Sequence, residues 1–217
     1  MSTLRRSLLV AVAVATVIAA AVAAWTLTPG SDREQSASGS AAIGGPFELV
    51  NTAGDTVTPE DFDGRYRLIY FGYTYCPDVC PSSLMDMSRA LDRLAETAPA
   101  KAERIVPIFI TIDPERDTVE VMRDYVENFH PRMVGLTGSE QQVKAAADTY
   151  RVYYEKVSPE QYYDSEAAAG RSDADYLMAH SSYIFLMGPD GEYVTNFKFE
   201  ESPADIAEGL AEQVDPR

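Results

Sequence analysis

Apolar runs alternate with amphipathic segments along most of this chain, and the alternation predicts an α/β domain. Two continuous apolar runs, at residues 67–72 and 105–112, have the length and composition of buried central strands. Shorter strands and amphipathic helices follow them in turn. The predicted strands are 67–72, 105–112, 133–136 and 152–157, and the predicted helices are 82–95, 118–129 and 139–150. Strands that alternate with helices predict a sheet with helices packed on its faces.

Turn-forming residues predict a hairpin at each end of this domain. Near the start, residues 46–50 and 56–58 flank a Gly-containing loop; near the end, residues 183–187 and 192–197 flank Gly188-Pro189-Asp190-Gly191. A helix at residues 203–213 closes the chain. Residues 158–179 break the pattern, and we interpret them as a surface insertion. The predicted fold is therefore an α/β sandwich with a mixed central sheet, an N-terminal hairpin and an insertion before the C-terminal hairpin.

The N-terminal residues predict where the domain resides. Residues 8–27 form an uncharged apolar run after Arg5 and Arg6. About 20 apolar residues can cross a bilayer as a helix. We predict a membrane anchor over residues 1–27, with the basic flank in the cytoplasm and the rest of the chain outside it, in the periplasm or its equivalent. A cleaved signal peptide is the alternative, because the run also holds small residues suited to cleavage; both predictions give the same compartment.

The remaining residues divide into a tether and one domain. Residues 28–45 are rich in Ser, Gly and Ala, and their composition predicts a flexible tether. Residues 46–217 are numerous enough for one domain with a hydrophobic core. The formal charge of −16 and the pI of about 4.4 argue against nucleic acid as a partner, because nucleic-acid binding needs a basic surface. The acidity is explained either by solubility or by a docking partner with a positive face.

Cys76 and Cys80 are the only cysteines of the chain, and they lie between a predicted central strand and a predicted helix that starts at Pro81. A structural disulfide is one interpretation, since an extracytoplasmic compartment oxidises thiols, but so small a loop restrains little chain entropy. Ligands favour the carboxyl ends of strands in open α/β sheets. A helix N-terminus also stabilises a thiolate, the form that attacks disulfides and binds metals. The position therefore suits both thiol redox chemistry and metal binding.

If the site binds a metal, the available ligands indicate which metal it is. Two thiolates with the imidazole of His180 form a soft-to-borderline set that suits copper. A closed structural zinc site usually takes four N or S ligands. The fourth candidate, His130, is expected instead to be a cation near a helix C-terminus. Zinc is therefore disfavoured, although a carboxylate could complete its shell.

Three separated motifs resemble those of the Sco/SenC family of copper chaperones. They are Phe71-Gly72-Tyr73-Thr74-Tyr75-Cys76-Pro77-Asp78-Val79-Cys80-Pro81, Thr111-Ile112-Asp113-Pro114-Glu115-Arg116-Asp117-Thr118, and the stretch from His180 through Leu186 to Pro189-Asp190-Gly191. The resemblance extends over about residues 46–210. It implies a thioredoxin-like fold on a membrane tether and a copper site of Cys76, Cys80 and His180. It also implies delivery of copper to the Cu-A centre of cytochrome c oxidase, or preparation of the cysteines of that centre.

One position departs from the family pattern. Members often carry an acidic residue immediately before the ligand histidine, and this chain has Ala179 there. A carboxylate at this position could orient His180 or contact a partner. Asp113, at the end of a predicted strand, is a candidate either for reaching the site or for capping a turn. Asp78 is expected to be an exposed docking charge.

Two functions share the cysteine pair. We favour a metallochaperone rather than an enzyme: it binds copper through Cys76, Cys80 and His180, docks and transfers the ion. Its expected partners are the copper-acceptor subunit of cytochrome c oxidase, an upstream copper donor and the membrane. The alternative is a thiol-disulfide reductase that keeps the target's metal-binding cysteines reduced and needs no histidine. A copper or redox sensor is a third interpretation. For all three functions, Tyr73 and Tyr75 are expected to pack beside the site.

Overall fold

The computed structural model describes residues 43–162 and 171–216. The predicted anchor or signal segment, residues 1–27, lies outside these described residues, as does most of the predicted tether. The described residues belong to one compact unit. No helix in the described part of the chain is long and apolar enough to cross a membrane.

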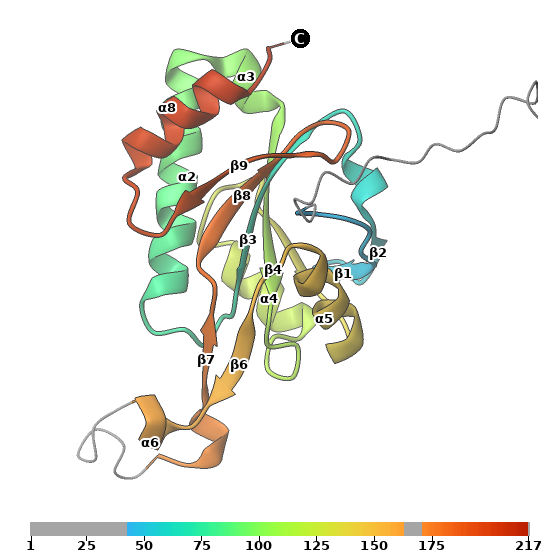
Figure 1. Cartoon of the computed structure of the whole chain (residues 1–217), viewed down its shortest axis with the longest axis vertical. Coiled ribbons are helices and arrows are strands. Elements are labelled where there is room, and N and C mark those ends of the chain that lie inside the picture. Colours follow the sequence, from blue (N-terminus) through green and yellow to red (C-terminus); the bar gives the residue numbers. More distant parts are fainter. Residues whose placement is uncertain (1–42, 163–170, 217) are drawn as a thin grey trace, which may run out of the picture. The chain divides into compact units, whose positions relative to one another are not determined.

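A mixed sheet forms the centre of the domain, as predicted (Figure 1). Its order is β2-β1-β5-β4-β3-β8-β9, and β3, β4 and β5 run parallel while the flanking strands run antiparallel. The strands of this sheet are β1 (Leu49–Asn51), β2 (Thr56–Val57), β3 (Tyr66–Gly72), β4 (Ile105–Thr111), β5 (Val134–Thr137), β8 (Tyr183–Met187) and β9 (Tyr193–Lys198). Both predicted hairpins are confirmed, because β1 pairs with β2 and β8 pairs with β9 antiparallel.

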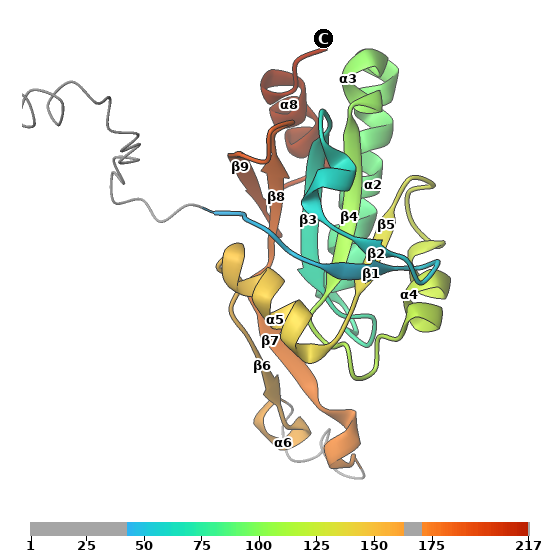
Figure 2. The ribbon, with the colours of Figure 1, turned by 90° about the vertical axis from the view of Figure 1, so that its right-hand side faces the viewer.

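Helices cover both faces of the sheet. The helical segments of the described chain are η1 (Pro59–Phe62), α2 (Val79–Thr97), α3 (Pro99–Glu103), α4 (Val119–Val126), α5 (Glu140–Thr149), α6 (Pro159–Tyr162), η2 (Asp173–Asp175) and α8 (Pro203–Gln213). Successive residues of a strand point to opposite faces. In β3, the ring of Phe71 contacts Tyr150 at the end of α5, whereas Gly72 faces Cys80 in α2. Therefore α2, with α8 packed beside it, and α5 lie on opposite faces, as Figure 2 shows.

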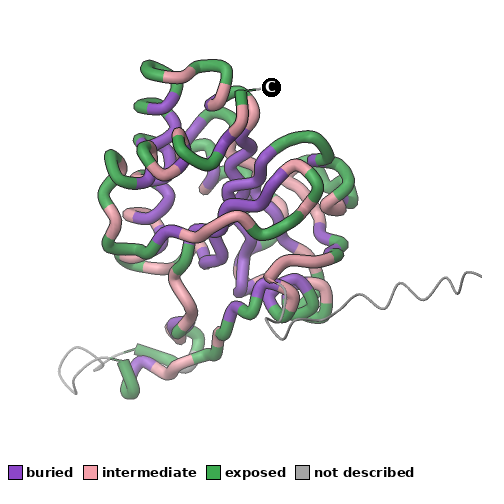
Figure 3. The backbone as a smooth tube through the Cα atoms, turned by 45° about the horizontal axis from the view of Figure 1, so that its top comes forward, coloured by how far each residue is buried: buried purple, intermediate pink, exposed green. Residues whose placement is uncertain are grey.

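The two central strands are buried along their whole length. Every residue of β3 and β4 is buried. Figure 3 shows that the buried stretches of the chain gather in the middle of the domain. This burial explains why both strands are almost entirely apolar, since helices cover both of their faces. Arg67 of β3 is a buried charged exception, and its guanidinium donates to the backbone oxygens of Pro59 and Gly188. On α2, the apolar face that the sequence predicted is also buried, with Leu84, Met87 and Leu91 fully covered.

The structure corrects the predicted start of α2. The helix begins at Val79 rather than at Pro81, so Cys80 lies within its first turn. Pro81 is still tolerated there, because the first N–H groups of a helix have no partner within the helix. Gly72 allows this arrangement: a Cβ atom at that position would lie 2.9 Å from Cys80 Sγ and 2.9 Å from a ring carbon of Tyr70. A glycine at the end of β3 therefore lets the cysteine pack directly against the strand.

The predicted insertion, residues 158–179, is wrong in one part. Its last residues form strand β7 (Leu177–His180), which pairs antiparallel with β6 (Tyr154–Val157). We call this two-stranded unit the arm. Leu177 and Met178 are buried, so contacts with the rest of the domain stabilise a strand that is too short to be recognised by its pattern. The arm lies beside the end of β3 that leads into the cysteine loop (Figure 1).

Candidate metal centre

The two cysteines lie where the loop after β3 enters α2. Both are free thiols in the structure; Cys80 is fully buried and Cys76 is partly exposed. The Cys76 sulfur accepts a hydrogen bond from the backbone N–H of Cys80 at 3.4 Å. A free N–H group at a helix N-terminus thus points at the Cys76 sulfur, as expected for a stabilised thiolate.

The local hydrogen bonds give the two thiols opposite properties. The side chain of Cys80 donates to Cys76, and with help from the backbone N–H groups of Cys80 and Asp78 this lowers the pKa of Cys76 to about 5. The same contact with Cys76, together with burial, raises the pKa of Cys80. The reduced pair therefore holds an accessible thiolate at Cys76 and a protonated, shielded thiol at Cys80.

His180 brings an imidazole to this pair from the end of β7. Its Nε2 lies 3.6 Å from Cys80 Sγ, and its Nδ1 lies 3.0 Å from the carbonyl oxygen of Ser181. If Nδ1–H donates to that carbonyl, the Nε2 lone pair faces the sulfur. Burial lowers the pKa of His180, so the ring is neutral near pH 7 and able to bind a metal. The Ser181 carbonyl thus orients the ring that a carboxylate at position 179 could have oriented; Ala179 itself is exposed.

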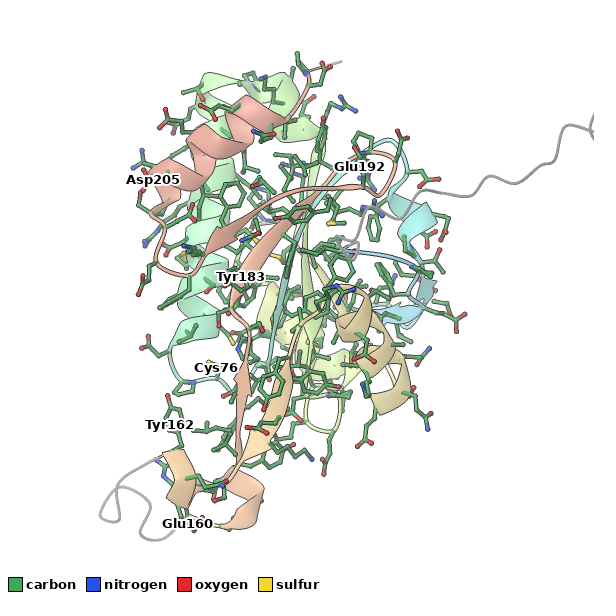
Figure 4. The ribbon with its side chains drawn as sticks, viewed as in Figure 1. Cys76, Glu160, Tyr162, Tyr183, Glu192 and Asp205 are labelled. Carbon is green, nitrogen blue, oxygen red and sulfur yellow. The ribbon has the colours of Figure 1, made fainter. Side chains whose placement is uncertain are left out.

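Two of the three predicted ligands already have the spacing of ligands on one ion. Donors bound at about 2.0–2.3 Å to a single metal lie roughly 3.5–4 Å apart, which matches the Cys80–His180 contact. Within the described residues, no set of three or more His, Cys, Asp or Glu side chains is fully gathered as a metal site. Cys76, labelled in Figure 4 on the loop that leads into α2, would have to move to complete the set as the third donor.

Aromatic rings enclose the imidazole and leave the thiolate accessible. The rings of Tyr70 and Tyr73 meet His180 edge-on at centroid distances of 6.2 Å and 6.1 Å. Tyr73 is buried, as expected for a packing residue, whereas Tyr75 is 52% exposed. Asp78 is exposed, as predicted.

The other candidates do not reach the thiols. His130 packs against α2, where its backbone N–H donates to Ser88 Oγ and its Nε2 lies 4.0 Å from Asp92 Oδ1. Burial lowers the pKa of His130, so the expected cation at a helix end is wrong: the ring is neutral near pH 7. Asp113 is also occupied elsewhere, because its carboxylate accepts hydrogen bonds from Arg116 and from the Tyr176 hydroxyl.

Asp117 is a supporting residue that the sequence reasoning missed. It is fully buried and accepts hydrogen bonds from the N–H (3.0 Å) and hydroxyl (2.6 Å) of Thr74 and from the hydroxyl of Thr111 (2.6 Å). Burial raises the pKa of Asp117, and these hydrogen bonds oppose that rise. The carboxylate therefore fixes the start of the cysteine loop to β4. Its place within the second family motif was the available signal.

Comparison with known proteins identifies the family of the chain. The family model described as SCO1/SenC matches residues 35–215. The chain belongs to the SCO1/SenC family. It is 39% identical over 168 residues to a SCO2-like protein of Rickettsia felis, covering 77% of this chain and 75% of that protein. It is 37% identical over 182 residues to the mitochondrial protein SCO1 homolog 1 of Arabidopsis thaliana.

Solved structures of SCO1/SenC proteins share this fold. The crystal structure of Arabidopsis thaliana ScoI with copper bound has a TM-score of 0.69 and 37% identity, with 79% of this chain and 98% of that one covered. Bradyrhizobium japonicum ScoI with copper bound has a TM-score of 0.66 and 38% identity, with 80% and 100% covered. These solved structures confirm the predicted thioredoxin-like α/β fold. The match to Arabidopsis SCO1 homolog 1 covers 84% of this chain but only about half of that protein.

The difference between the two thiols predicts selective reactivity. In the reduced, metal-free protein, alkylation of Cys76 by iodoacetamide should increase with pH around a midpoint of about 5, because the thiolate is the reactive form. The thiol of free cysteine has a pKa of about 8.5. Mass spectrometry after short exposures should find the label on Cys76, and Cys76→Ser should react only slowly because Cys80 is buried. A midpoint at or above pH 8, or first labelling of Cys80, contradicts this assignment.

Proposed function

We propose that this protein carries copper, which it binds through Cys76, Cys80 and His180 and hands to an acceptor protein. The observation that carries the proposal is the 3.6 Å contact of His180 Nε2 with Cys80 Sγ, beside the Cys76 thiolate. Copper is the cargo in this proposal, held while the protein travels or docks and released at the acceptor.

The chemistry of the donors supports copper over other ions. Thiolates are soft ligands and imidazole is borderline, a set that suits copper. Cu(I) is satisfied by two or three such ligands, whereas a closed zinc site usually takes four N or S ligands. No fourth His or Cys in the described chain lies near the pair, since His130 packs against α2. The copper-bound relatives have the same fold. We extend copper binding to this chain because its own donor set suits that metal.

Family membership suggests the destination of the copper. We propose that the acceptor is the Cu-A subunit of cytochrome c oxidase, that an upstream carrier loads the site, and that the domain works outside the cytoplasm on an N-terminal membrane tether. A partly exposed Cys76 and an exposed Asp78 at the rim of the site are suited to contact with such an acceptor.

The asymmetry of the two thiols favours one second candidate, a thiol-disulfide reductase. The Cys76 thiolate would attack a disulfide of the target, form a mixed disulfide and release one target thiolate. Cys80 would then lose its proton to that thiolate and attack Cys76, releasing the second target sulfur as a thiolate. The target gains two electrons and the pair ends as a disulfide. An accessible low-pKa thiol followed by a buried one is the arrangement that such exchange requires.

Copper loading should depend on the redox state of the pair. We expect the reduced protein to bind about one copper per chain and the oxidised protein to bind none, because a disulfide has no thiolate to donate. Metal analysis after gel filtration, with thiols counted in parallel, measures both. Stoichiometric copper on the fully oxidised protein would refute the proposal.

Replacement of His180 should separate the two functions. His180→Ala is expected to weaken copper binding, and Cu(II) binding more than Cu(I), because Cu(II) has the greater preference for nitrogen donors. Disulfide formation between Cys76 and Cys80 should remain. His130→Ala is the matched control, because His130 packs beside Ser88, two turns along α2 from Cys80, and it should leave both affinities unchanged. If His180→Ala keeps both affinities and instead abolishes reductase activity, His180 is not a ligand.

A further inference from the structure

A row of alternating rings and cations joins the cysteine loop to the arm. Tyr75 comes from the cysteine loop, Arg116 from the loop after β4, Tyr176 from the start of the arm's second strand, and Lys156 from β6. The Arg116 guanidinium carbon lies 4.6 Å from the ring centre of Tyr75 and 3.6 Å from that of Tyr176. Lys156 Nζ lies 4.5 Å from the ring centre of Tyr176. Each distance is within the range of a cation–π interaction. We call these four residues the latch.

Hydrogen bonds fix Arg116 within the latch. Its Nε donates to the carboxylate of Asp113, and its Nη1 donates to the backbone oxygen of Tyr176 at 2.9 Å. The Tyr176 hydroxyl donates to the same carboxylate at 2.7 Å. Asp113 is only 1% exposed, and its buried carboxylate accepts hydrogen bonds from the two latch residues Arg116 and Tyr176. A buried carboxylate that loses such a partner is costly, so the latch holds the arm closed.

The latch lies at one end of β7 and the imidazole at the other. Tyr176 immediately precedes β7, and His180 is its last residue. Tyr75 immediately precedes Cys76 in the chain. The same Arg116 side chain therefore contacts a neighbour of one proposed ligand and the strand that carries another. At the far end, Ser181 N–H donates to the Tyr153 carbonyl at 3.0 Å, so the two strands of the arm remain joined next to His180.

We propose that Arg116 is a positioning residue for the metal centre: by holding Tyr176 against Tyr75 it keeps β7 over the cysteine loop and so keeps His180 within reach of the two sulfurs. Arg116 acts through the arm and does not contact the metal. This inference rests on the proposed role of His180 as a copper ligand. Lysine could not replace Arg116, because the planar guanidinium stacks between two rings while it donates in two further directions.

A double-mutant cycle tests the coupling. Arg116→Gln should lower the Cu(II) affinity of the reduced protein about tenfold, the lower end of the effect of removing a residue that supports a ligand. In the His180→Ala background, Arg116→Gln should cause almost no additional loss, because the residue through which it acts is gone. Affinities come from competition titrations with a chelator. Arg89→Gln is the matched control: it removes an arginine whose side chain is 63% exposed on α2, and it should change neither affinity.

A second measurement reads the arm without copper. Hydrogen exchange of the reduced, metal-free protein should show that Arg116→Gln exposes the amides of residues 177–180 while β3 and β4 keep their protection. Hydrogen exchange therefore tests the positioning role of Arg116 separately from the ligand role of His180. If His180 is not a ligand, His180→Ala leaves Cu(II) affinity unchanged, yet the exchange result still reports whether the latch holds the arm.

Two results overturn the proposal. One is an equal loss of affinity on Arg116→Gln with and without His180, which indicates general destabilisation. The other is unchanged hydrogen exchange in β7.

If the Arg116→Gln protein has no cooperative unfolding transition, Tyr176→Phe replaces it in the test. This variant keeps the ring and loses only the hydroxyl contact with Asp113. It should give a smaller loss of affinity, and that loss should again be absent in the His180→Ala background. Additive losses for Tyr176→Phe count against the proposal equally.

Discussion

Cys80 Sγ and His180 Nε2 lie 3.6 Å apart although 100 residues separate them in the chain. A soft metal site needs donors that converge without a large rearrangement on binding, and the fold supplies this convergence from two directions. The first turn of α2 places one sulfur under the end of β3, and the arm brings the imidazole across it. Each of the other site features either holds one of these two segments in place or changes the protonation of the groups that they carry.

Buried polar groups hold both segments. Asp117 fixes the start of the cysteine loop to β4, and Asp113, with Arg116, fixes the arm to the same region of the sheet. Both carboxylates are almost completely buried, so their hydrogen bonds are costly to break. The helix N-terminus and the Cys80 thiol favour the Cys76 thiolate, while burial keeps His180 neutral. All these effects favour a site with one thiolate and one free imidazole already prepared near neutral pH, before any metal arrives.

Much of this fold could be predicted from local pattern. The runs at 67–72 and 105–112 correspond to β3 and β4, because strands covered on both faces are largely apolar. The residues around Gly188 formed the expected hairpin. One strand of the arm, β6, lies within the predicted strand at 152–157. Its partner β7 could not be predicted, because it has four residues and its burial depends on contacts with distant segments. The three proposed ligands followed from the motifs, whereas Arg116 and Asp117 act between loops, and their partners are visible only in three dimensions.

X-ray absorption at the copper edge tests the central claim most directly. The account predicts that copper bound to the reduced protein has two sulfur scatterers and one nitrogen scatterer from an imidazole. His180→Ala should remove the outer-shell signal of the imidazole ring and leave both sulfurs, and Cys76→Ser should remove one sulfur. An unchanged imidazole signal in His180→Ala, or a single sulfur in the unmodified protein, would contradict a shared site of Cys76, Cys80 and His180.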